Sequence, residues 1–275
     1  MTGDPETPCR VAERFGEILL REEICRLRDA RNALILAHCD EPDAVKGTAD
    51  VVGDDLALLR AAASSGAVDL VVCAPRPVAE TVQLLRPDAR VISPVPGAAC
   101  PPDPEPGPGA LQAARQEHPH AALVVGVRSP LEAKALADIT CTPETFTEVV
   151  ESLEEEAILV AVPALDPATL PEAWAGGKEI IAVPVPPEGQ EEGHPPGSAD
   201  SGIAEGTAAG PEDGVWRGAF FPRHCTICHG VRETTLPDLY RSMVTGESRV
   251  EIPAALLSQA RRPVLRMMDV LGRGP

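Results

Sequence analysis

Short apolar runs of strand length, separated by segments with helical periodicity, recur along this chain of 275 residues. The first run, NALILAHC at 32–39, ends on polar residues, which is typical of a buried parallel strand whose carboxyl end opens into a site. A helix is predicted at 53–66, where GDDLALLRAAASSG stops at a glycine, and VDLVVCAP at 68–75 predicts the next buried strand. This order of strand, helix and strand predicts an α/β fold with parallel sheets.

The pattern also divides the chain into units. Three strands are predicted in a first unit that ends near Cys100, and three more in a second unit that begins after the Pro- and Gly-rich linker at 101–109. A brief strand around VWRGAFF and two helices at 235–244 and 253–271 close the chain. The predicted segments are an N-terminal helix (1–31), a first α/β unit (32–100), a second α/β unit (110–183), a loop or disordered tract rich in Pro, Gly, Glu and Ala (184–214) and a reduced third unit with the C-terminal helices (215–275).

The charge of the chain argues against several classes of function. A formal net charge of -18 and a pI near 4.7 leave no basic stripe that could neutralise nucleic-acid phosphates or an anionic membrane surface. The first twenty residues carry several charged side chains, and no run of about 18 apolar residues occurs, so neither a signal peptide nor a transmembrane helix is expected. We therefore expect a cytoplasmic protein whose eight cysteines are reduced thiols or metal ligands.

The densest cluster of metal-ligating side chains lies in HCTICHGVRETTLPDLY, which runs from His224 to Tyr240. The spacing of Cys225 and Cys228 before His229 matches c-type haem attachment, which requires export to an oxidising compartment. Zinc held by the two cysteines and a histidine is a second interpretation. An iron-sulfur cluster held by thiolates from distant parts of the chain is a third. These residues alone leave the three interpretations open.

Several separated motifs follow one another along the chain: ALILAH, GDDLALLRAAA, VAETVQLL, EAKALADITCT and GGKEIIAV, then C-x4-ETTLPDLY and a closing helix with IPAAL and RPVLRMMDVL. In order and spacing they resemble the quinolinate synthase family, over roughly residues 17–183 and 225–271. The resemblance implies three pseudo-symmetric three-layer α/β/α units with parallel sheets around a central cavity. The third unit is expected to be truncated in this chain.

The resemblance also implies a chemistry. Members of the family hold a [4Fe-4S] cluster by three cysteines, one from each unit, and its open iron acts as a Lewis acid on substrate atoms. They condense iminoaspartate with dihydroxyacetone phosphate, losing phosphate and water, to give quinolinate for NAD biosynthesis. The implied partners are therefore a small dicarboxylate and a triose phosphate, with L-aspartate oxidase as the upstream source.

The expected cluster ligands are only partly present. Cys100 aligns with the first cluster cysteine of the family and Cys228 with the third. No cysteine follows GKEII where the second is expected, and the next one along the chain is Cys225, which is the candidate replacement. Cys39 and Cys73, at the ends of predicted strands, are alternatives.

The substrate-contacting residues diverge further. His38 keeps the histidine of the family's H-Y-Y motif and is the candidate catalytic residue, but both tyrosines of that motif are replaced. Asp55 stands for the serine of the G-D-S-L turn, Arg76 for the histidine ahead of the A-E-T helix, and Arg128 for the last residue of Y-V-N. Because Arg binds carboxylate and phosphate groups bidentately, both arginines are candidate substrate-binding residues, with surface charges as the alternative. A hydrogen-bonded strand-end residue is the alternative interpretation of His38.

Two classes of function follow from these observations. One is an enzyme, either a quinolinate synthase or a divergent relative whose cluster acts on another substrate. The other is a non-catalytic scaffold or regulatory relative that has lost the cluster. The replaced tyrosines and the missing cysteine favour divergence from the family activity, because catalysis depends on positioned contacts, whereas the retained Cys100, Cys228 and His38 favour the family activity.

Overall fold

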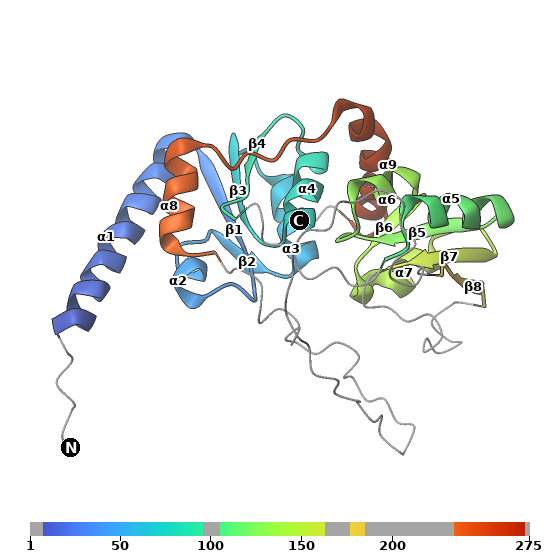
Figure 1. The fold of residues 1–275 in the computed structure, drawn as a ribbon, viewed down its shortest axis with the longest axis horizontal. Coiled ribbons are helices and arrows are strands. Elements are labelled where there is room, and N and C mark those ends of the chain that lie inside the picture. Colours follow the sequence, from blue (N-terminus) through green and yellow to red (C-terminus); the bar gives the residue numbers. More distant parts are fainter. Residues whose placement is uncertain (1–7, 96–104, 163–176, 185–233, 273–275) are drawn as a thin grey trace, which may run out of the picture.

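The computed structural model describes residues 8–95, 105–162, 177–184 and 234–272 (Figure 1). Its named strands form two four-stranded sheets, and all registered strand pairs in both sheets are parallel. Helices connect and cover these strands. The prediction of an α/β fold with parallel sheets is confirmed.

The first sheet has the strand order β2-β1-β3-β4. Its strands are β1 (Ala33–His38), β2 (Val51–Gly53), β3 (Asp69–Cys73) and β4 (Arg90–Ile92). The helices around it are α1 (Pro8–Arg31), α2 (Asp43–Lys46), α3 (Asp55–Ser64) and α4 (Arg76–Leu85). Strand β1 pairs with β2 on one side and with β3 on the other, so the chain passes from β1 to β2 and then crosses back over β1 to β3. The carboxyl end of β1 therefore lies at a topological switch point.

The second sheet repeats this topology, with the strand order β6-β5-β7-β8. Its strands are β5 (Ala122–Gly126), β6 (Ile139–Cys141), β7 (Ala157–Ala161) and β8 (Glu179–Ala182). Its helical segments are α5 (Pro108–Glu117), α6 (Leu131–Leu136), a 3-10 turn (Pro143–Thr145) and α7 (Phe146–Glu151). In each sheet the first strand of the unit lies between the second and the third, so β5 occupies in the second unit the place that β1 occupies in the first.

Each sheet has one strand more than the sequence predicts. The additional strands, β2 and β6, are three residues long and lie at the edges of their sheets. An edge strand of this length pairs on one side only and is too short to show an alternating pattern, so tertiary pairing defines it.

Alternating side chains on β1 build a core on both faces of the first sheet. Leu36 packs toward α3 and α4, whereas Ile35 packs toward α1 and the later helix α8 (Leu236–Thr245). Ile24 of α1 and Leu239 of α8 are fully buried in this second layer, and Figure 1 shows the two helices side by side. The first unit is therefore a three-layer arrangement of helices, sheet and helices.

The last helix, α9 (Ala254–Val270), packs against both units. Val264 and Met267 are fully buried in a core that also includes residues of α4 and of β6. Just before this helix, residues 248–250 pair with β4, where the Val250 N–H donates to the Val91 carbonyl at 2.9 Å. The two helices predicted at the end of the chain are confirmed, whereas the strand around VWRGAFF and most of the tract at 184–214 lie outside the described residues.

Within the described ranges, no helix has the length and apolar character needed to span a lipid bilayer.

Candidate active site

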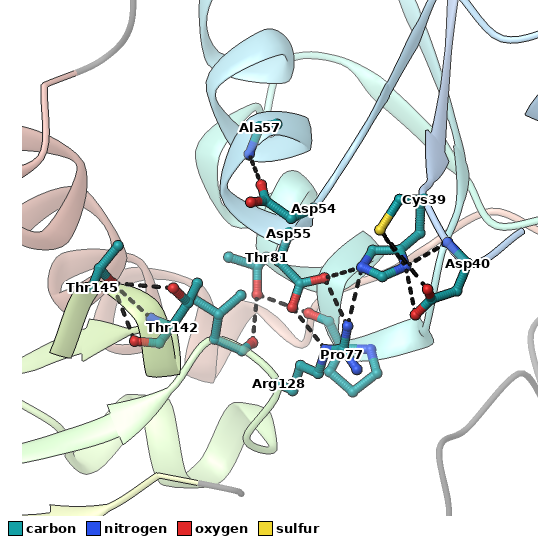
Figure 2. A network of polar contacts seen from close by, with 12 residues as sticks. Cys39, Asp40, Asp54, Asp55, Ala57, Pro77, Thr81, Arg128, Thr142 and Thr145 are labelled. Carbon is teal, nitrogen blue, oxygen red and sulfur yellow. Dashed lines mark hydrogen bonds and ion pairs between the residues drawn. The ribbon is translucent and has the colours of Figure 1, made fainter. Parts of the chain in front are cut away.

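Three of the predicted site residues meet between the two units. His38 is the last residue of β1, Asp55 is the first residue of α3, and Arg128 follows β5 in the second unit. Arg128 donates from Nε to Asp55 Oδ2 at 2.7 Å and from Nη2 to Asp55 Oδ1 at 3.1 Å. The same Nη2 lies 3.2 Å from His38 Nε2, and His38 Nε2 lies 3.4 Å from Asp55 Oδ1. Figure 2 shows this bidentate pair, which joins groups 73 residues apart in the chain.

The residues just before Asp55 fix its position at the start of α3. Asp54 caps α3, with its side chain accepting a hydrogen bond from the Ala57 N–H at 2.8 Å. Gly53 precedes it at a close approach, because a Cβ there would lie 2.6 Å from the Ala57 Cβ. The Asp55 carboxylate is largely buried in the first turn of the helix, where the helix dipole favours a negative charge.

The turn after β1 surrounds the other nitrogen of His38. The Asp40 N–H donates to His38 Nδ1 at 3.3 Å, and Asp40 Oδ2 lies 3.4 Å from the same nitrogen. Cys39 Sγ is 3.9 Å from Nδ1 and 3.9 Å from Asp40 Oδ1. Burial and then the Asp40 carboxylate raise the pKa of the Cys39 thiol. His38 is thus a buried ring with the Asp55 and Arg128 pair on one side and two exposed ligand-type side chains on the other.

Arg76 lies apart from this group. It is the first residue of α4, and its Nε donates to Glu80 Oε1 at 2.8 Å within the same helix. Half of its side chain is exposed. In the described part of the chain its ion pair is with Glu80 rather than with Asp55, so its substrate-binding role stays a prediction.

The cysteines predicted to hold metal, Cys100, Cys225 and Cys228, lie outside the described residues. Of the two alternatives, Cys73 is fully buried in β3, and burial, followed by Glu41, raises its pKa well above the ordinary value. Metal ligation requires a thiolate, so this environment favours a structural role for Cys73. Cys39 is exposed at the carboxyl edge of the first sheet, beside His38.

A buried network next to the site was not found from the sequence. Lys134 of α6 has no exposed surface, and its Nζ donates to Thr81 Oγ1 at 2.9 Å and to the Pro77 carbonyl at 3.4 Å. The Thr81 hydroxyl lies 2.7 Å from the Pro77 carbonyl oxygen and 3.2 Å from that of Val127, the residue before Arg128. Burial lowers the pKa of Lys134 to about 8. The contacts of Thr81 hold the loop after β5 against α4 (Figure 2). In the sequence, the lysine among the apolar residues of EAKALAD is the one sign that a buried polar group lies here.

The chain returns to this edge before α8. The Glu41 carboxylate accepts from the Thr234 N–H at 3.1 Å and from the Thr234 hydroxyl at 3.2 Å. Thr235 then caps α8, its hydroxyl accepting from the Asp238 N–H at 3.2 Å. The start of α8 is therefore held against the turn that carries Cys39.

Comparison with known proteins identifies the family of this arrangement. The model of the quinolinate synthetase A protein family matches residues 22–183. Quinolinate synthase of Methanoregula boonei is 30% identical over 299 residues, which cover 91% of this chain and 98% of that protein. Quinolinate synthase 2 of Methanosarcina acetivorans is 39% identical over 141 residues, or 51% of this chain and 46% of that protein. For quinolinate synthase of Mycobacterium leprae strain TN the values are 38% over 154 residues, 56% and 44%. The match over more than half of the chain, together with the relative that is aligned along nearly its whole length, shows that this chain belongs to the quinolinate synthase family.

Proposed function

We propose that this protein is a quinolinate synthase-like enzyme, which condenses iminoaspartate with dihydroxyacetone phosphate at a [4Fe-4S] site in NAD biosynthesis. The observation that carries the proposal is the position of His38, at the carboxyl edge of the first sheet and in contact with Arg128 of the second unit, within the stretch that matches the family. Active sites of parallel α/β sheets form at such edges. L-aspartate oxidase is the proposed source of iminoaspartate.

The proposed cluster ligands are Cys100, Cys228 and Cys225. Parallel strands end at one edge of a sheet, so β4 ends at the edge where His38 lies, and Cys100 comes eight residues after Ile92, the last residue of β4, in the sequence. Cys228 precedes Thr234, which contacts Glu41 at that same edge. Of the four cysteines whose side chains the structure describes, Cys39 is exposed, Cys25 is half-buried, and Cys73 and Cys141 are buried. When bound, such a cluster supplies a Lewis acid that polarises substrate oxygen atoms.

The chain's own residues contribute proton transfer and charge. His38 Nε2 lies between a donor, Arg128, and an acceptor, Asp55, so this nitrogen can take or give a proton during loss of a hydroxyl or phosphate group. Arg128 donates hydrogen bonds to both oxygens of Asp55, which places a negative charge against the guanidinium. A substrate carboxylate that binds to Arg128 must compete with this charge.

That ion pair favours a second candidate, a divergent relative that acts on a substrate with less negative charge. The proposed family substrates are anionic, and Asp55 adds a buried carboxylate where such a substrate would approach Arg128. If this interpretation holds, Asp55→Ser should lower the KM for iminoaspartate, because it frees the guanidinium for a substrate carboxylate.

Anaerobic reconstitution with iron and sulfide tests the proposal. We expect bound iron and sulfide close to one [4Fe-4S] cluster per chain, and quinolinate formation from iminoaspartate and dihydroxyacetone phosphate. Cys100→Ser, Cys228→Ser and Cys225→Ser should each lose the cluster, whereas the matched control Cys25→Ser, in α1, should keep it.

The outcomes separate the candidate functions. A cluster without quinolinate formation would favour the divergent enzyme. Wild-type protein that binds neither iron nor sulfide after reconstitution would reject both enzymatic proposals and leave the non-catalytic relative.

A further inference from the structure

We propose that His38, Cys39 and Asp40 form a binding site for one divalent cation of the zinc class, separate from the iron-sulfur site proposed above. The inference rests on the arrangement of these three side chains and is independent of the proposed condensation. It assigns a metal-binding role to the turn after β1, which joins a buried histidine to two solvent-accessible ligands.

The distances between the ligand atoms fit one tetrahedral ion. Zinc bonds of about 2.0–2.1 Å to nitrogen, about 2.3 Å to sulfur and about 2.0–2.2 Å to oxygen place ligand atoms of a tetrahedron roughly 3.4–3.6 Å apart. His38 Nδ1 and Asp40 Oδ2 are 3.4 Å apart, and Cys39 Sγ lies 3.9 Å from Nδ1 and 3.9 Å from Asp40 Oδ1. The 3.4 Å distance involves Asp40 Oδ2 and the 3.9 Å distance to the carboxylate involves Asp40 Oδ1, and one ligand atom from each of the three residues lies within 4.8 Å of the other two. Rotation of the exposed Cys39 and Asp40 side chains would close the three-ligand set around one ion.

The donor set selects the class of metal. An imidazole nitrogen and a thiolate are ligands of zinc and similar transition-metal ions, whereas magnesium and calcium prefer oxygen atoms throughout. Three protein ligands leave a fourth tetrahedral position for water or another small ligand. Cys39 and Asp40 are exposed, so this fourth position is accessible from solvent.

The second side of the His38 ring carries an independent observation. A metal on Nδ1 requires the proton on Nε2, and Asp55 Oδ1 lies 3.4 Å from Nε2 as its acceptor. Carboxylate groups commonly orient metal-bound histidines in this way. Arg128 holds the Asp55 carboxylate with two hydrogen bonds, and its Nη2 also lies 3.2 Å from His38 Nε2. The Asp40 N–H donates to Nδ1 at 3.3 Å, so the Nδ1 lone pair faces the turn. Asp55 and Arg128 are thus positioning residues for the imidazole.

Cobalt binding tests this inference in the full chain. The reduced, chelator-treated protein carries Cys225→Ser and Cys228→Ser in every sample, which removes the thiols of the HCTICH segment, and is titrated anaerobically with Co²⁺. We expect one equivalent to bind with thiolate-to-cobalt charge-transfer absorption and the strong visible bands of tetrahedral Co²⁺, and Zn²⁺ to displace it.

Single variants then identify the ligands. Cys39→Ser should abolish the charge-transfer absorption and Asp40→Asn should weaken binding, whereas the matched thiol control Cys25→Ser should leave the titration unchanged. Asp55→Asn should raise the Kd for Co²⁺ by about 10- to 100-fold without changing the spectrum, as expected of a group that only orients a ligand. Circular dichroism of each variant verifies that the fold is intact.

Two results would overturn the inference. One is Co²⁺ binding that is unchanged in folded Cys39→Ser. The other is loss of the reconstituted iron-sulfur cluster in Cys39→Ser, because Cys39 would then be a cluster ligand. A chain that binds Co²⁺ through Cys39 but forms no cluster would support the inference while rejecting the proposed condensation, so the two proposals fail separately.

Discussion

Replacing Lys134 by methionine removes a fully buried ammonium group while keeping an unbranched side chain of similar length. Burial lowers the pKa of this lysine from 10.5 to about 8, and Glu80 is the largest influence that opposes the shift. Between these two pKa values the folded chain binds fewer protons at Lys134 than the unfolded chain does. The free energy of unfolding therefore rises with pH across this window, and the penalty for the buried charge is complete below about pH 8.

The magnitude follows from the two pKa values. The interval between 10.5 and about 8 corresponds to about 3 kcal/mol, since one pKa unit is worth about 1.4 kcal/mol. Between about pH 7 and about pH 9.5 the contribution of Lys134 to the free energy of unfolding should increase by about 2 kcal/mol. Loss of the bonds from Nζ to Thr81 and Pro77 changes stability equally at both pH values, so the pH dependence isolates the charge.

Urea unfolding of wild type and Lys134→Met at these two pH values measures the effect. We expect the wild type to gain about 2 kcal/mol more than the variant on going to the higher pH. The matched control is Lys46→Met, which removes a lysine whose ammonium group reaches the surface beside Asp43. Parallel pH dependence of wild type and Lys134→Met, with Lys134→Met folded, would refute the reasoning.

Three further substitutions test the packing around the site by urea unfolding. Gly53→Ala should lower the free energy of unfolding by about 1–3 kcal/mol, because the added Cβ would overlap that of Ala57. Its control, Gly109→Ala, has open space around the added carbon and should be neutral or stabilising by up to about 1 kcal/mol. Equal effects of the two substitutions would contradict the overlap. Asp54→Ala should cost about 1 kcal/mol through loss of the cap of α3, and an unchanged midpoint would show that the cap contributes nothing. Phe146→Ala should cost about 3–5 kcal/mol, since Phe146 is fully buried beneath the second sheet, and a loss below 1 kcal/mol would mean that the site collapses around the smaller residue.

Local sequence determines the interior strands of this fold better than its edges. The runs that form β1 and β5 are continuous and apolar, because helices cover both of their faces, so length and composition were enough to find them. The three residues of β2 are a strand only because β1 offers a partner on one side. Such a strand is defined by a neighbour from elsewhere in the chain, which no window of sequence contains.

The site shows the same division. His38, Asp55 and Arg128 were selected one at a time by resemblance, but their mutual contact depends on how the second unit packs against the first. Arg76 pairs with Glu80 four residues along α4, which is a local pattern that the sequence could have shown. The buried contact of Lys134 could not be predicted from the sequence, because its partner, Thr81, lies 53 residues away.

The packing of α9 across both units has a consequence for synthesis on the ribosome. Both parallel sheets emerge before this helix, but Val264 and Met267 fill the core that the two units share. Until the final helix is translated, a nascent chain therefore exposes the apolar side chains of α4 and β6 that α9 covers in the folded protein. Chaperone capture should be strongest for chains stalled after β8 and should fall once α9 has left the exit tunnel.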